Sequence, residues 1–127
     1  MIEFKGITKQ IGDKVILDDI NIHIKDGELV VLIGPSGCGK TTTLKMINKL
    51  IKPTEGSIFI NGHSIASEDT IQLRRKIGYV IQNVGLFPHM TIKENIELIP
   101  KLKKEPLDQI NKKTIELLNM VGLNSDE

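Results

Sequence analysis

Polar and apolar residues alternate early in the chain and then give way to an unbroken apolar run. Ile20, Ile22 and Ile24 alternate with polar neighbours, and a period of two predicts a strand with one buried face. After a hairpin turn predicted at residues 26–27, residues 29–33 are all apolar, which is typical of a strand covered on both faces in a largely parallel sheet. The pattern therefore predicts a one-sided antiparallel ribbon that leads into a fully buried strand.

Helical spacing follows a glycine-rich loop at residues 34–39. Apolar residues recur at helical intervals from about Lys40 to Ile51, so we predict a helix there that Pro53 and Gly56 end. The order strand, glycine loop and helix indicates an α/β fold.

The second half of the chain predicts shorter elements. In order they are a strand at 57–60 that ends in a turn at Asn61-Gly62, a brief helix at 70–76, a buried strand at 77–81, a helix that begins with a capping box at Thr91 and Glu94, and a helix from about Pro106 to Gly122. These elements follow one another without a repeat or a flexible linker.

Composition narrows the classes of function. The 127 residues include 17 basic and 16 acidic side chains, for a net charge of +1, which excludes binding driven mainly by bulk charge. Aromatic residues interleaved with basic ones are lacking, so nucleic-acid binding is not expected. No apolar run approaches the roughly 18 residues of a membrane span, and the start of the chain does not resemble a secretory signal. We expect a cytoplasmic protein.

The glycine loop carries the most specific chemistry in the sequence. It matches the pattern G-x-x-x-x-G-K-[ST] over Gly34, Pro35, Ser36, Gly37, Cys38, Gly39, Lys40 and Thr41. Glycines allow the backbone to curl so that its N–H groups point inward, and the start of the following helix adds a positive dipole end to the same concavity. We therefore predict a site for the phosphates of a nucleotide.

The residue types at the end of the loop suit separate roles. Lys40 should reach the β and γ phosphates as a point charge, and the Thr41 hydroxyl is placed to ligate Mg²⁺. Thr42 is a candidate contact to the α phosphate. Cys38 is the only cysteine, and we interpret it as a small filler in the loop whose modest reactivity bound nucleotide should suppress. The expected ligand is Mg-ATP.

Two predicted strands precede the glycine loop. Farther along the chain, in the segment from Ile77 to Thr91, Gln82 follows a predicted buried strand and Leu86-Phe87-Pro88 follows Gln82. This arrangement resembles the ATP-binding subunits of ATP-binding cassette (ABC) transporters over essentially all 127 residues. The resemblance implies a truncated phosphate-loop ATPase core with an N-terminal antiparallel ribbon. We expect residues 1–33 to form the ribbon and loop strand, 34–90 the core, and 91–127 the start of a helical arm.

The resemblance also implies roles and partners. Gln82 matches a glutamine whose amide meets Mg²⁺ and the attacking water, so Lys40 and Gln82 are the candidate catalytic residues. The loop after Gln82, with His89 in it, would touch membrane-spanning subunits, and a second ATP-binding subunit would complete a homodimer on the inner face of the cell membrane. The segments at 45–48, 74–82 and 86–91 look most like importers of the osmoprotectants glycine betaine, carnitine or choline.

Several parts of such an ATPase do not occur after Gln82: the serine-glycine-glycine signature, the apolar strand ending in Asp-Glu, and the switch histidine. We therefore expect 127 residues to be about half a domain that binds Mg-ATP without hydrolysing it. Ile11 stands where an aromatic residue usually stacks on adenine, so apolar contact would replace stacking. The run from Val15 to Asp19 precedes the loop and is not expected to hold a metal.

The sequence is also compatible with two other functions. One is a self-sufficient small phosphate-loop kinase or GTPase, which phosphoryl transfer or a strong guanine preference would favour. The other is a non-enzymatic fragment that only binds ATP.

Overall fold

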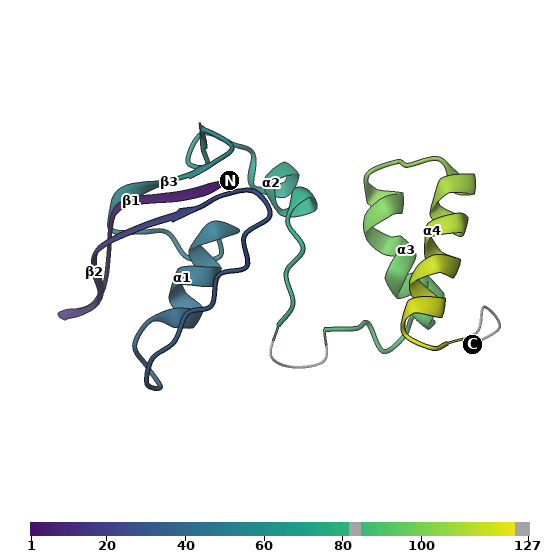
Figure 1. Cartoon of the computed structure of the whole chain (residues 1–127), viewed down its shortest axis with the longest axis horizontal. Coiled ribbons are helices and arrows are strands. Elements are labelled where there is room, and N and C mark those ends of the chain that lie inside the picture. The colour runs from purple at the N-terminus through teal and green to yellow at the C-terminus, as the bar shows by residue number, and fades with distance from the viewer. Residues whose placement is uncertain (82–84, 124–127) are drawn as a thin grey trace. The chain divides into compact units, whose positions relative to one another are not determined.

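The computed structural model describes residues 1–81 and 85–123 (Figure 1). The chain divides into two compact units, Met1–Ile77 and Gly78–Glu127. Within the described residues, no helix is long and apolar enough to cross a lipid bilayer.

The first unit contains a four-stranded antiparallel sheet. Its strands are β1 (Ile2–Ile11), β2 (Lys14–Ile24), β3 (Glu55–Ile60) and β4 (His63–Ser64), and they lie in the order β2-β1-β3-β4. The predicted ribbon is the β1–β2 pair, in which Ile2 faces Ile24 and Phe4 faces Ile22. The predicted turn after β3 is also present, because Asn61 and Gly62 have φ of 50° and 80°, as a tight hairpin turn requires.

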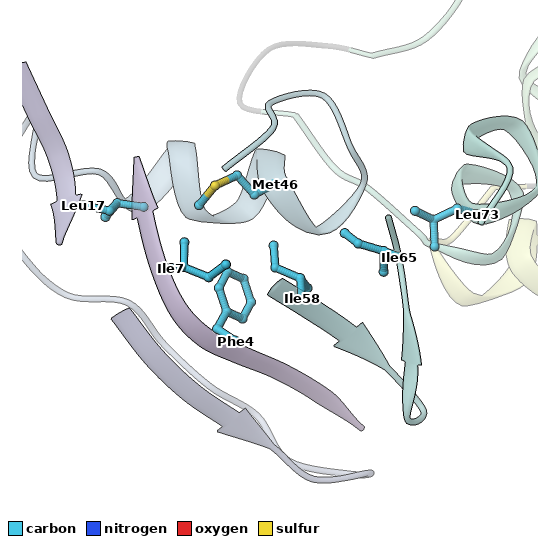
Figure 2. Packing of buried hydrophobic residues seen from close by; sticks show 7 residues of the cluster. All are labelled: Phe4, Ile7, Leu17, Met46, Ile58, Ile65 and Leu73. Atoms are coloured by element: carbon cyan, nitrogen blue, oxygen red, sulfur yellow. The ribbon is translucent and has the colours of Figure 1, made fainter. Parts of the chain in front are cut away.

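Helix α1 (Lys40–Ile47) lies against one face of this sheet. Met46 projects from α1 toward Ile7 of β1 and Ile58 of β3 (Figure 2). These three side chains are almost completely buried, as are Phe4 and Leu17. Burial of that apolar surface holds the helix and the glycine loop before it in place, because each such side chain contributes roughly 1.5–3 kcal/mol.

Helix α1 is shorter than the sequence predicts, and it does not reach Ile51. Lys49 has φ of 56°, and the hydrogen bonds from Leu50 N to Lys45 O and from Lys49 N to Met46 O form the turn that ends many helices. That left-handed position usually holds glycine, so a lysine there gave no signal in the sequence.

Helix α2 (Thr70–Lys76) forms where it is predicted. Asp69 caps its start by accepting a hydrogen bond from Gln72 N at 2.9 Å. From its last turn, Arg74 donates to the carbonyl oxygens of Asn48 at 3.0 Å and Lys49 at 3.1 Å. Arg74 thus satisfies acceptors that the end of α1 leaves free.

The two buried strands predicted at 29–33 and 77–81 are wrong. Residues 29–33 and 78–81 have no strand pairing, and Leu29 and Ile33 are each 92% exposed and Val80 95% exposed. A continuous apolar run indicates cover on both faces. The described residues do not supply that cover for either segment, and neither segment has a neighbouring strand among them.

The second unit contains a pair of helices, α3 (Ile92–Leu102) and α4 (Leu107–Met120), which pack side by side (Figure 1). The predicted capping box is present, since Thr91 Oγ1 accepts from Glu94 N at 3.1 Å and Thr91 N donates to Glu94 Oε2 at 2.8 Å. Helix α3 continues through Pro100 to Leu102. Helix α4, which forms where it is predicted, buries Ile110, Thr114 and Leu118, while Leu107 and the adjoining Val121 are exposed.

Candidate nucleotide-binding site

The glycine loop joins residues 29–33 to the start of α1, and two of its glycines adopt conformations that other residues rarely adopt. Gly37 and Gly39 have φ of 82° and 94°. At Gly39 a Cβ atom would lie only 2.6 Å from Leu17 Cδ2 and 3.2 Å from the carbonyl oxygen of Ile16. The loop therefore depends on glycine at position 39 both for its backbone conformation and for its close approach to β2.

Gly39 also leaves the start of α1 open to an anion. It is the N-cap of the helix and makes no side-chain capping hydrogen bond, and the first turn carries no acidic residue. The free N–H groups and the positive dipole end of the helix are thus not neutralised by the protein's own side chains. Thr43, one turn later, donates its hydroxyl to Gly39 O at 3.0 Å.

The ammonium group of Lys40 folds back over the loop. Its Nζ atom donates to the carbonyl oxygens of Gly34 and Pro35, each at 2.7 Å, and lies 3.6 Å from Cys38 Sγ. Gly34 and Cys38 pack closely, since a Cβ atom on Gly34 would meet Cys38 Sγ at 2.7 Å. The lysine charge is therefore held at the mouth of the loop by the loop's own backbone.

The donor set of this loop fits phosphate. It combines a lysine ammonium, helix N–H groups, and the hydroxyls of Ser36, Thr41 and Thr42, of which Ser36 and Thr41 are exposed. For Mg²⁺, which prefers oxygen ligands, the loop supplies the Thr41 hydroxyl. In the described part of the chain no group of three or more His, Cys, Asp or Glu side chains is placed to hold a metal ion.

An open hollow lies beside the loop, between β2 and residues 31–33. It encloses about 610 Å³ and is lined by Leu17 and Ile20 of β2 and by Cys38, Lys40 and Thr43, among others. Ile11, the expected adenine contact, does not line it. Ile11 pairs with Lys14 at the β1–β2 hairpin and is 57% exposed.

The second expected part of the site involves Gln82, which lies outside the described residues. Beyond it, Phe87 and His89 contact each other edge to face, with ring centroids 5.8 Å apart. Asn95, which the sequence analysis did not single out, organises this loop. Its side chain accepts from Phe87 N at 2.7 Å and donates to the carbonyl oxygens of Phe87, Met90 and Thr91 at 3.2, 3.2 and 2.9 Å.

Comparison with known proteins decides which family carries this loop. The profile of the ABC transporter family matches residues 17–127, which is most of the chain. The chain belongs to the ABC transporter family. Among solved structures of ABC proteins, a dimeric post-hydrolysis state of an ATP-binding cassette bound to ADP and Pi is 34% identical, with a TM-score of 0.82. That match covers 99% of this chain and 59% of the other, and it confirms the expected α/β ABC ATPase fold.

Curated ABC transporter relatives are similar over nearly the whole chain. The choline transport ATP-binding protein OpuBA of Bacillus subtilis is 50% identical over 99% of this chain. The carnitine transport ATP-binding protein OpuCA of Listeria monocytogenes is 54% identical over 97%, and the osmoprotectant import ATP-binding protein OsmV of Salmonella typhimurium is 47% identical over 98%. The chain spans about a third of the length of these relatives, 31% to 34%.

Proposed function

We propose that the chain binds Mg-ATP through residues 34–42. The observation that carries the proposal is the start of α1, where Gly39 leaves the helix N–H groups without a side-chain acceptor and no acidic residue competes for them. The Lys40 ammonium adds a positive charge at the same mouth. An anion gains from both features, because backbone donors at a helix start and a lysine charge act together on phosphate oxygens.

Each side chain at the loop's end has one role in the proposal. Lys40 holds the β and γ phosphates, exchanging its bonds to Gly34 O and Pro35 O for bonds to phosphate oxygens. Thr41 ligates Mg²⁺ and Thr42 contacts the α phosphate, while Gln82 offers an amide to the metal and the attacking water. When bound, Mg²⁺ neutralises part of the phosphate charge.

We further propose that the whole protein is the ATP-binding subunit of an importer for quaternary-amine osmoprotectants. Identity favours the choline and carnitine members of this class, since relatives named for choline and carnitine transport reach 50% and 54%. Relatives named for Fe(3+) import, spermidine/putrescine import and glycine betaine uptake reach 45%, 42% and 42%. The partners in this proposal are a second ATP-binding subunit and membrane-spanning subunits that contact the loop after Gln82. The protein would then lie on the inner face of the cell membrane.

Cys38 provides a reporter for nucleotide in the loop, since its thiol is exposed and lies 3.6 Å from Lys40 Nζ. We expect Mg-ATP to slow alkylation of Cys38 in the wild-type chain and to have no effect in Lys40→Ala. Equal rates with and without Mg-ATP in the wild type would count against the proposed site, and protection by Mg-GTP alone would favour a GTPase.

Hydrolysis is expected to need the whole protein. Phosphate release by this chain should therefore equal that of the Lys40→Ala variant. Sustained turnover above that blank would refute the view that residues beyond this chain complete the catalytic site.

A further inference from the structure

A second hollow lies at the other end of α1 from the phosphate loop. It encloses about 270 Å³, close to the lower limit of roughly 300 Å³ for small-molecule sites. Its walls come from the end of α1, from β3 and from the segment that follows β4. At about 1.5 Å per residue, the eight residues of α1 place it on the order of 10 Å from the phosphate loop.

The floor of this hollow is apolar. Met46, Ile58 and Ile65 line it, and they are 0%, 2% and 5% exposed. They come from α1, from β3 and from the segment after β4, and Figure 2 shows them in the same buried cluster. Ile51 and Pro53 also line the hollow and are half-buried, so they leave apolar surface in contact with water. The hydrocarbon part of a ligand would cover that surface, and apolar contact would replace contact with water.

The rim of the hollow is cationic. Lys49 and Lys52 both line it, and none of its lining residues is acidic. The Lys49 ammonium is fixed by hydrogen bonds to Glu68 O at 2.8 Å and Ala66 O at 3.4 Å. The nearby Glu68 carboxylate pairs instead with Lys76, at 3.7 Å.

Lys52 is the free cation of this rim. It is exposed, and no hydrogen bond or ion pair of its ammonium occurs among the residues that the structure describes. A ligand anion can therefore approach it without displacing an internal partner, and Lys49 adds a second positive charge at fixed position.

We propose that this hollow binds a small amphipathic monocarboxylate, with its apolar body on the floor and its carboxylate at Lys52. An inorganic anion would leave the apolar floor unfilled, and a neutral apolar molecule would make no use of the two ammonium groups. The proposal is independent of nucleotide binding, since none of these residues belongs to the phosphate loop.

Benzoate is a suitable probe, and benzyl alcohol is its neutral counterpart. In an NMR titration of the chain, benzoate should shift the methyl signals of Met46, Ile58 and Ile65 and bind more tightly than benzyl alcohol. Lys52→Gln should weaken benzoate binding about tenfold through loss of a charge-assisted contact, and should leave benzyl alcohol unaffected. Lys14→Gln, on β2 and outside the hollow, is the matched control and should leave both unchanged.

A variant that closes the mouth tests the location separately. Ala66 lines the hollow and is exposed, so Ala66→Phe should preserve the fold and abolish the benzoate-induced methyl shifts. The proposal is overturned if benzoate fails to bind, if benzyl alcohol binds equally well, if Lys52→Gln has no effect, or if the shifts occur at the phosphate loop instead.

Discussion

Replacing Gly39 with alanine tests whether the glycine loop is held by close packing against β2. The new Cβ atom would lie 2.6 Å from Leu17 Cδ2, well inside ordinary contact distance. Leu17 is 7% exposed and belongs to the buried core, so it cannot move aside without disturbing its neighbours.

Two costs add in this variant. An L residue at positive φ costs about 1–2 kcal/mol, and forcing a packed core side chain to shift adds about 1–3 kcal/mol. We therefore expect Gly39→Ala to lower the free energy of unfolding of the Met1–Ile77 unit by about 2–5 kcal/mol. Gly37→Ala is the matched control, because Gly37 has φ of +82° but nothing within 4 Å of an added Cβ. Its free energy of unfolding should fall only by the cost of placing an L residue at positive φ.

Urea unfolding followed by the NMR signals of β1 and β2 measures this difference within the first unit. With a slope of about 1–3 kcal/mol per molar urea, Gly39→Ala should unfold at a midpoint lower than that of Gly37→Ala by about 1 M. In a Leu17→Ala background the extra cost of Gly39→Ala should shrink, by a coupling of about 0.5–3 kcal/mol. Equal midpoints for Gly39→Ala and Gly37→Ala would refute the packing argument.

Three further changes have definite expected outcomes. Gly56→Ala should unfold the sheet, because its Cβ atom would lie 2.3 Å from the carbonyl oxygen of Gly6, a backbone atom that cannot move aside. Loss of the dispersed NMR signals of β1 would show this unfolding. Hydrogen bonds from Thr91, first from its backbone N–H, hold the pKa of the Glu94 carboxyl below its usual range. The stability that this carboxylate gives α3 is therefore present above the unfolded-state pKa and is lost as pH falls through the lowered folded-state pKa. Amide exchange in the first turn of α3 should speed up over that pH range. Asn95→Ala removes four hydrogen bonds to residues 87–91 and should lower the stability of that loop by about 1–3 kcal/mol. Faster amide exchange of Phe87 would show the loss.

A matched control variant accompanies each of these three predictions. Gly62→Ala has φ of +80° and open space around an added Cβ, so a loss of structure as large as that of Gly56→Ala would contradict the close approach between β1 and β3. Glu94→Gln should remove the acid-dependent change at the start of α3, and an unchanged pH profile would exclude Glu94 as its source. Asn119→Ala, on the exposed side of α4, should leave exchange of Phe87 as it is; similar effects from the two asparagine variants would point to general destabilisation.

Features that depend on neighbouring residues could be predicted from the sequence. The turn at Asn61-Gly62 and the Thr91–Glu94 capping box arise from contacts within a few residues. The strand from Ile20 to Ile24 pairs with a distant segment, but its alternation of apolar and polar residues is visible in the local sequence. The conformation of the glycine loop and the start of α1 belong to the same group, because the glycines and the helix start lie together in the chain.

Features that depend on distant partners could not be predicted. The apolar runs at 29–33 and 77–81 indicate burial, yet burial requires neighbours that the described residues do not provide. The early end of α1 depends on Lys49 in a left-handed conformation and on Arg74 binding the last carbonyl groups, and no sequence pattern marks either. The contact of Gly39 with Leu17 likewise joins two segments that only the fold brings together.

The most direct test of the central claim is calorimetric titration of Mg-ATP into the wild-type chain, Lys40→Ala and Lys14→Ala. Lys14 is an exposed lysine at the start of β2, so its variant removes the same charge away from the loop. We expect saturable binding by the wild type and by Lys14→Ala, and none by Lys40→Ala. Binding of equal strength by all three proteins, or by none, would contradict a nucleotide site built on residues 34–42.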